Sequence, residues 1–222
     1  MKTTVKDIMT SHVLAVRTST PYKDMAVQFH RERVSAFPVV DDEGKVVGIV
    51  SEGDLLPKET PNPRNPVRTP GMEAHILYLR DEKKAEACSA ADLMTEPAVT
   101  VGPDDTVDHA ARVMYLHRVK RLPVVDADGG LVGIISRADV LSVFDRPDEE
   151  IGKEISDDVI QNDLQADPTH LTITVTDGIV TLEGTPDTVS LGHAIVSCAR
   201  HVQGVVAVRD RLEYPAPDLR KQ

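Results

Sequence analysis

Aromatic residues and cysteines are scarce in this sequence. Of its 222 residues none is tryptophan, 3% are aromatic and two are cysteines, Cys88 and Cys198. These cysteines lie far apart and outside any CxxC motif, so we expect reduced thiols rather than a disulfide or a metal site. With so few rings, the hydrophobic cores must consist of Val, Ile, Leu and Ala, as in small α/β and α+β domains.

Long apolar segments are absent as well. No stretch approaches the ~20 apolar residues that span a bilayer. Lys6, Asp7 and His12 interrupt the beginning of the sequence, which is therefore unlike a secretory signal. We expect a cytoplasmic location from these two absences. Hydrophobic residues still make up 41% of the chain, which is enough for globular domains.

Positive charge is in deficit, and the formal net charge is −11. Residues 1–146 contain 19 Lys and Arg against 22 Asp and Glu, a net charge of −3. Residues 147–222 contain 6 against 14, a net charge of −8. This balance disfavours nucleic acid and anionic membranes as partners. Together with the lack of a helix-turn-helix pattern, it disfavours a transcription regulator.

Catalytic motifs are missing too. The sequence contains no P-loop, GxSxG or HExxH motif, and its eight histidines have no metal-ligand spacing with carboxylates or thiols. We therefore predict that the protein is not an enzyme, with no catalytic residues and no metal site.

An internal repeat determines the predicted architecture. Residues 7–56 align with residues 92–141 at a constant offset of 85 without a gap, and 18 of the 50 pairs are identical. DIMT returns as DLMT, and RVSAFPVVDDEGKVVGIVSEGDLL returns as RVKRLPVVDADGGLVGIISRADVL. Such a match predicts two copies of one structural module.

The local patterns predict the order β-α-β-β-α in each copy. A short strand precedes a helix, with Thr20 as the expected cap in the first copy and Asp104 or Asp105 in the second. An Asp- and Gly-rich turn between two β-branched runs then predicts a hairpin. Ser51 and Ser136 lie where the N-cap of a second helix is expected.

A proline-rich segment separates the copies, and a third domain follows them. The third domain should contain an amphipathic helix, a hairpin with a type I′ turn at Asp177 and Gly178, a helix starting at Thr185 or Pro186, and a last strand, in the order α-β-β-α-β. We divide the chain into a first repeat (1–57), a linker with the start of a helix (58–84), a second repeat (85–146), the third domain (147–215) and a tail (216–222).

The repeat resembles the CBS domain over nearly all of residues 1–146. The resemblance is carried by the G-h-h-S-x-x-D motifs GIVSEGD (48–54) and GIISRAD (133–139), by the PVVD strands with Pro38 and Pro123, and by the D-[IL]-M-T openings. In that family two copies pack sheet to sheet as a Bateman module with two clefts, and such modules often form homodimers. The resemblance implies an α/β (α+β) fold and a homodimer.

The two motifs fit an adenine nucleotide chemically. Ser51 and Ser136 would place a hydroxyl beside the free backbone N–H groups of a helix start, where a phosphate can bind. Asp54 and Asp139, one helical turn later, can accept hydrogen bonds from both hydroxyls of a ribose, and the Val- and Ile-rich strands can hold a purine. The alternative is that the serines only cap helices. The doubled set predicts binding of an adenine nucleotide (AMP, ADP or ATP) as a regulatory ligand, and related adenosyl ligands such as S-adenosylmethionine or NAD-type ligands suit the same cleft.

The two clefts should differ in charge. By the family pattern, Lys120 and Arg121 would face the motif of the first repeat, whereas their counterparts Ser35 and Ala36 would face the motif of the second. A phosphate-rich ligand should therefore prefer the Ser51 motif.

The third domain resembles the BON domain, a small α/β module that its family associates with membranes or phospholipids. The resemblance rests on DGIVTLEG (177–184) and VQGVVAV (202–208). Because this region is acidic, we expect an interaction or output module acting on a client protein, with membrane contact as the alternative. The whole chain is predicted to be a regulatory nucleotide sensor. A structural dimerisation or tethering protein without a physiological nucleotide is the other possibility.

Overall fold

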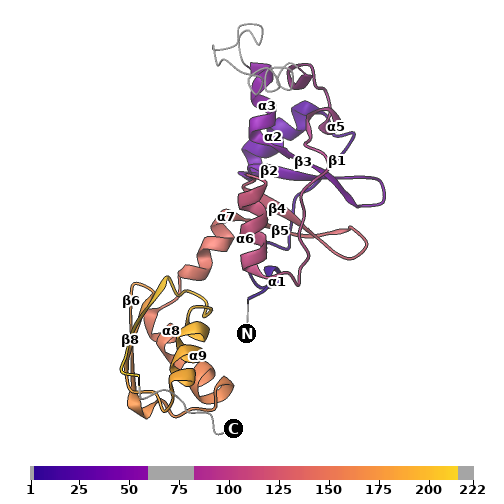
Figure 1. Cartoon of the computed structure of the whole chain (residues 1–222). Helices are drawn as coiled ribbons and strands as arrows, with labels where there is room; N and C mark the ends of the chain where they lie inside the picture. Colours follow the sequence, from indigo (N-terminus) through magenta and orange to yellow (C-terminus); the bar gives the residue numbers. More distant parts are fainter. Residues whose placement is uncertain (1–2, 60–82, 215–222) are drawn as a thin grey trace, which may run out of the picture. The chain divides into compact units, whose positions relative to one another are not determined.

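The computed structural model describes residues 3–59 and 83–214. The chain divides into two compact units, which we call the N-terminal unit (4–137) and the C-terminal unit (138–214, with Thr3). Both are mixed α/β structures, as the sequence predicted (Figure 1). Most of the linker (58–84) and of the helix predicted to start in it falls outside the described residues, and the described part of that helix ends at residue 85, before the separate helix α5 (Ala90–Leu93).

The first repeat follows the predicted order of elements. Its three-stranded sheet has β1 parallel to β2 and β2 antiparallel to β3. The elements are α1 (Val5–Ile8), β1 (Val16–Arg17), α2 (Tyr22–Glu32), β2 (Ala36–Val40), β3 (Val46–Ser51) and α3 (Glu52–Glu59).

The second repeat keeps the hairpin and the helices but not the full first strand. The predicted strand is reduced to a single bridge between Val101 and Val124, which is parallel like the pairing of β1 with β2. The elements are α5 (Ala90–Leu93), α6 (Val107–Leu116), β4 (Arg121–Val125), β5 (Leu131–Ser136) and α7 (Arg137–Leu141), followed by the 3-10 helix η1 (Ser142–Phe144).

The predicted helix caps were wrong at two places. Pro21 itself is the N-cap of α2, and Thr106 rather than Asp104 or Asp105 caps α6. In both repeats the expected cap, Thr20 or Asp105, instead accepts a backbone N–H from the turn before the helix. Thr20 and Asp105 therefore correctly indicated a turn, but the helix starts predicted from them lay one or two residues too early.

The opening segment of each repeat pairs with the hairpin of the other. The backbone N–H of Thr10 donates to the carbonyl of Ile134 at 3.0 Å, and that of Thr95 donates to Ile49 at 2.9 Å. Both pairs also form antiparallel bridges. The two copies are therefore joined by exchanged backbone hydrogen bonds, which explains why they cluster into one unit.

A methionine side chain of the other repeat packs against the first glycine of each motif. A Cβ added to Gly48 would lie 2.5 Å from Sδ of Met94, and a Cβ added to Gly133 would come still closer to Sδ of Met9. A larger residue at either position would force the methionine side chain to shift. The methionine of the D-[IL]-M-T opening of one repeat therefore contacts the first glycine of the G-h-h-S-x-x-D motif of the other repeat.

The core of the N-terminal unit packs α2 and the segment around α5 on the first sheet. The rings of Phe29 and Phe37 lie 4.3 Å apart, centroid to centroid. The buried residues of this cluster are Val16, Met25, Phe29, Phe37, Val39, Val50, Leu55, Ala87, Ala90 and Leu93. All but the two Phe are aliphatic or Met, as the shortage of aromatic residues requires.

The C-terminal unit has the predicted order α-β-β-α-β, with its helices on one face of the sheet (Figure 1). Strand β7 is central, antiparallel to β6 and parallel to β8. The elements are α8 (Asp148–Glu154), the π-helix η2 (Ile155–Asp163), the 3-10 helix η3 (Pro168–His170), β6 (Leu171–Thr176), β7 (Ile179–Gly184), α9 (Val189–Ala199) and β8 (Ala207–Leu212).

The hairpin turn of this unit is the predicted type. Asp177 and Gly178 have φ values of 52° and 71°, as a type I′ turn requires. Their N–H groups donate to the carboxylate of Asp148 at 2.7 and 2.8 Å, which fixes the turn to the start of α8. The helix predicted to start at Thr185 or Pro186 was placed too early, because Thr188 is the cap of α9.

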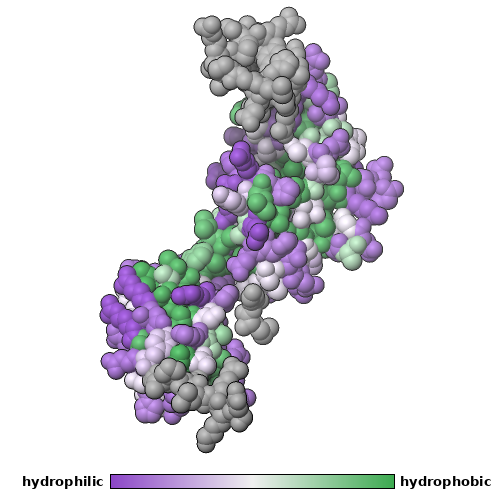
Figure 2. Space-filling model, in the orientation of Figure 1, coloured by the Kyte–Doolittle hydropathy of each residue, from purple (hydrophilic) through white to green (hydrophobic). Residues whose placement is uncertain are grey.

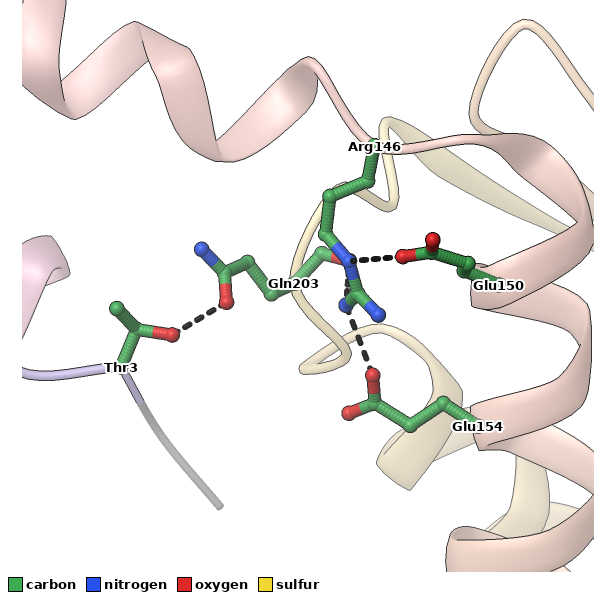
Figure 3. A network of polar contacts seen from close by, with 5 residues as sticks. All are labelled: Thr3, Arg146, Glu150, Glu154 and Gln203. Atoms are coloured by element: carbon green, nitrogen blue, oxygen red, sulfur yellow. Dashed lines mark hydrogen bonds and ion pairs between the residues drawn. The ribbon is translucent and has the colours of Figure 1, made fainter. Parts of the chain in front are cut away.

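A polar network holds the segment before α8 to the loop after α9 (Figure 3). Arg146 donates to Glu154 at 2.8 Å and to the backbone carbonyl of Gln203 at 3.0 Å, and its Nε lies 3.9 Å from Glu150. The hydroxyl of Thr3 donates to the side-chain oxygen of Gln203. No helix within residues 3–59 and 83–214 is long and apolar enough to cross a membrane.

The exchanged methionine contacts predict the cost of filling the motif glycines. Gly48→Ala and Gly133→Ala should each lower the free energy of unfolding by about 1–3 kcal/mol, the usual cost of overpacking a core. Gly53→Ala is the matched control, because its nearest outside atom would lie 3.7 Å away and alanine favours a helix. Urea unfolding measures all three. An equal effect of Gly53→Ala and Gly48→Ala would contradict the contact.

Candidate functional site

In the first G-h-h-S-x-x-D motif, the serine and the aspartate are hydrogen-bonded to each other at the start of α3. Ser51 is the last residue of β3, and Asp54 lies in the first turn of α3. The backbone N–H and the hydroxyl of Ser51 both donate to Oδ2 of Asp54, each at 2.7 Å. These bonds have the geometry of a capping box and stabilise the helix start.

The other carboxylate oxygen of Asp54 belongs to a buried ion pair. Nζ of Lys84 contacts Oδ1 of Asp54, and the two side chains are 7% and 14% exposed, respectively. Lys84 lies in the helical turn 83–85, which is 30 positions along the chain from Asp54. The ribose-binding candidate of the first repeat is therefore held on both oxygens by its own chain.

Arg121 connects the two repeats beside this site. Its guanidinium donates to the hydroxyl of Ser35. The carbonyl of Ser35 in turn accepts the N–H of Glu52, the first residue of α3, at 3.2 Å. In the β4–β5 ladder Arg121 is paired with Ser136. The side chain of Arg121 therefore contacts the first repeat, whereas its backbone is part of the hairpin of the second repeat.

The second motif runs from β5 into α7. Ser136 ends β5 and Asp139 lies in α7, and both are half-buried. The carbonyl of Asp139 accepts the hydroxyl of Ser142 at 2.7 Å. Lys120 is exposed, and its carbonyl accepts the N–H of Arg137 at 3.0 Å. Of the six predicted site residues, Ser51 and Asp54 form a side-chain hydrogen bond with each other.

Lys84 was not predicted from the sequence as a site residue. This residue precedes the second repeat, so the repeat alignment could not single it out. Its surroundings, EKKAEA, have an ordinary helical composition. No spacing rule links a lysine to an aspartate in another helix, and only the packing of the turn 83–85 on α3 brings the two together.

The opening segments contain a capping box of the same kind that sequence analysis also missed. Thr4 and Ser89, which are related by the repeat offset, donate their N–H and hydroxyl to Asp7 and Asp92 at 2.7–2.9 Å. The pKa of Asp7 is lowered chiefly by the backbone N–H of Thr4, and that of Asp92 chiefly by the hydroxyl of Ser89. A box with Ser or Thr three positions before Asp therefore stabilises helix starts in this chain and does not by itself indicate a ligand.

Chemically, the candidate residues suit binding. Carboxylates accept hydrogen bonds from vicinal hydroxyls, and the guanidinium and ammonium groups attract phosphate. Within residues 3–59 and 83–214 no three His, Cys, Asp or Glu side chains are grouped so as to hold a metal ion.

Comparison with known protein families agrees with this architecture. The CBS domain model matches residues 5–58 and 90–146, and the BON domain model matches residues 147–216. The chain belongs to the CBS-domain family and carries a C-terminal BON domain. Two CBS repeats in tandem, with the exchanged openings described above, form a CBS pair.

Among its relatives, the protein MJ1426 of Methanocaldococcus jannaschii is 32% identical over 152 residues, which cover 63% of this chain and 90% of that protein. The chloroplastic CBS domain-containing protein CBSX2 of Arabidopsis thaliana is 32% identical over 147 residues, and the match covers 62% of each chain. The crystal structure of CBSX2 in complex with AMP superposes with a TM-score of 0.53 over 62% of this chain and 93% of that one.

Proposed function

We propose that this CBS pair binds an adenosine-containing ligand, such as AMP, ADP or ATP, and acts as a regulatory sensor rather than as an enzyme. The observation that carries the proposal is the pair of G-h-h-S-x-x-D motifs on a fold similar to that of CBSX2, whose crystal structure is a complex with AMP. The Asp54 and Asp139 carboxylates would hold the ribose. Arg121 and Lys120 would attract phosphate, with Ser51 and Ser136 beside them.

The competing function is a scaffold that binds no nucleotide. The capping box at Asp54 favours it, because Thr4 and Asp7 form the same box at an opening segment. Ligand binding separates the two functions, since a ligand at 100 times its dissociation constant adds about 2.7 kcal/mol of stability.

The ligand proposal predicts the effect of neutralising the motif aspartates. With Asp54→Asn and Asp139→Asn combined, calorimetric titration with AMP should show a loss of about 1.5–3 kcal/mol, the range for hydrogen bonds to charged groups. Asparagine keeps the volume and one acceptor oxygen. Asp108→Asn, on the exposed face of α6, is the control and should bind as the wild type does. Unchanged affinity in the double variant would exclude these carboxylates as ribose ligands.

We further propose that two chains associate through the helices of the N-terminal unit. On these helices Val27, Leu56, Tyr115 and Leu116 are 55%, 64%, 81% and 64% exposed. Apolar side chains interrupt the hydrophilic surface in the region of α6 (Figure 2). Helices with several exposed apolar side chains can form interfaces, and a second copy is the occupant that the family resemblance implies.

This interface can be tested at two neighbouring positions. Tyr115→Glu combined with Leu116→Glu should convert a dimer to a monomer in analytical ultracentrifugation, because two charges would be buried in the contact. Tyr115→Phe, which keeps the ring, should leave the dimer intact. A wild-type monomer, or a dimer unaffected by the two glutamates, would place the contact elsewhere or exclude it.

The BON domain is proposed to be an output module that contacts a client protein. Residues 147–222 carry a net charge of −8, which opposes attraction to anionic lipid. The full-length protein should therefore stay in the supernatant when sedimented with vesicles containing phosphatidylglycerol at 0.1 M salt or below. Co-sedimentation that decreases as salt rises would instead identify a membrane-binding domain.

A further inference from the structure

Strand β6 forms an open edge of the sheet in the C-terminal unit. The strand order is β6-β7-β8, so β6 is paired on one side only. Its register with β7 continues without a shift along the whole strand. Within residues 3–59 and 83–214, no backbone group is hydrogen-bonded to the outer side of β6. Such a side presents a row of N–H and C=O groups to which another strand can bind.

The register identifies the backbone groups that point outward. The two-residue turn makes Thr176 and Ile179 a hydrogen-bonded pair, and along an antiparallel ladder such pairs alternate with pairs that are not hydrogen-bonded. The backbone groups of Leu171, Ile173 and Val175 therefore point away from β7. The side chains of these three residues pack against the core, whereas the threonines of β6 are exposed. An added strand would continue both the apolar and the polar face of the sheet.

The other strand edges of the described chain are charged, short or bridged. Strand β8 carries Arg209, Asp210 and Arg211, and the carboxylate of Asp210 accepts the N–H of Leu212 at 3.0 Å. In the N-terminal unit β1 has two residues, and β3, β4 and β5 carry bridges to other segments. Charge, short length and coverage are common means of preventing strand pairing. Strand β6, with the sequence LTITVT, contains no charge, no proline and no bulge.

Acidic side chains flank this edge at both ends. Asp177 lies in the turn after β6, and the carboxylate of Asp148 accepts two backbone N–H groups of the same turn. Asp167 precedes the strand at the other end, and both it and Asp177 are exposed. A second copy of β6 in antiparallel pairing would bring Asp167 of one chain toward Asp177 of the other, and like charges disfavour this. A strand with basic ends would meet opposite charges instead.

We propose that β6 is the surface with which the C-terminal unit binds its client, by adding an extended segment of that protein to the sheet. This segment has apolar, β-branched residues at alternate positions and Lys or Arg at its ends. In such complexes the backbone hydrogen bonds supply affinity, and the alternate side chains supply specificity. The inference rests on the proposed function of the BON domain as an output module, and it specifies the contact surface and the chemistry of the partner.

Synthetic peptides and the full-length protein test this inference. The peptide KKTVTVTVKK should bind in fluorescence anisotropy, and EETVTVTVEE should bind at least ~10-fold more weakly at low salt. KKTVPPTVKK should not bind, because proline lacks the N–H that extends a ladder.

Variants of the protein locate the peptide on the sheet. Val175→Pro removes one outward N–H and should weaken KKTVTVTVKK at least ~10-fold, while the ladder with β7 does not use that group. Circular dichroism verifies that this variant is folded. Asp167→Asn combined with Asp177→Asn should weaken the peptide about threefold, and asparagine suits both the cap and the turn. Glu213→Gln is the matched control beyond β8, at the opposite edge of the sheet, and should leave the affinity unchanged.

Four results would overturn the inference. They are no binding of KKTVTVTVKK to the wild type, equal affinity for the Lys- and Glu-flanked peptides, binding that Val175→Pro leaves unchanged, and a Val175→Pro chain of lower mass than the wild type in analytical ultracentrifugation. The last result would make a second copy the occupant of β6. None of the four bears on nucleotide binding, and failure of the output role itself would appear as binding to anionic vesicles.

Discussion

The contact between the methionine of one repeat and the motif glycine of the other is the constraint on which the CBS pair depends. Met9 lies on Gly133 and Met94 lies on Gly48, and in both cases the next residue of the opening segment bridges to the facing hairpin. Each hairpin therefore carries a backbone bridge from the other repeat, and the two repeats form one compact unit. The same glycines begin the motifs that carry the candidate ligand residues, which couples packing to the site.

A single carboxylate caps a helix and forms a buried ion pair at the first motif. As a cap, Asp54 satisfies the N–H of Ser51 and stabilises the start of α3. Its other oxygen, Oδ1, contacts the ammonium group of Lys84. The capping bonds use Oδ2 and the ion pair uses Oδ1, so one carboxylate joins the end of β3, the start of α3 and the helical turn 83–85.

Much of the fold could be predicted because its signals are local and doubled. The hairpin turns and the apolar face of the helix beginning at α8 follow from short-range patterns, and the repeat follows from the similarity of two segments 85 residues apart. The caps of α2 and α6 were misplaced because Thr20 and Asp105 serve equally well in the turn before a helix. The exchange of opening segments could not be predicted, since a pattern within one repeat does not reveal which sheet it joins. Lys84 was missed for the same reason, because its partner lies in another helix.

The most direct test of this account is a crystal structure of the full chain grown with AMP. We predict a nucleotide whose ribose hydroxyls contact Asp54 or Asp139. A structure in which AMP contacts neither aspartate would contradict the proposed function of the pair.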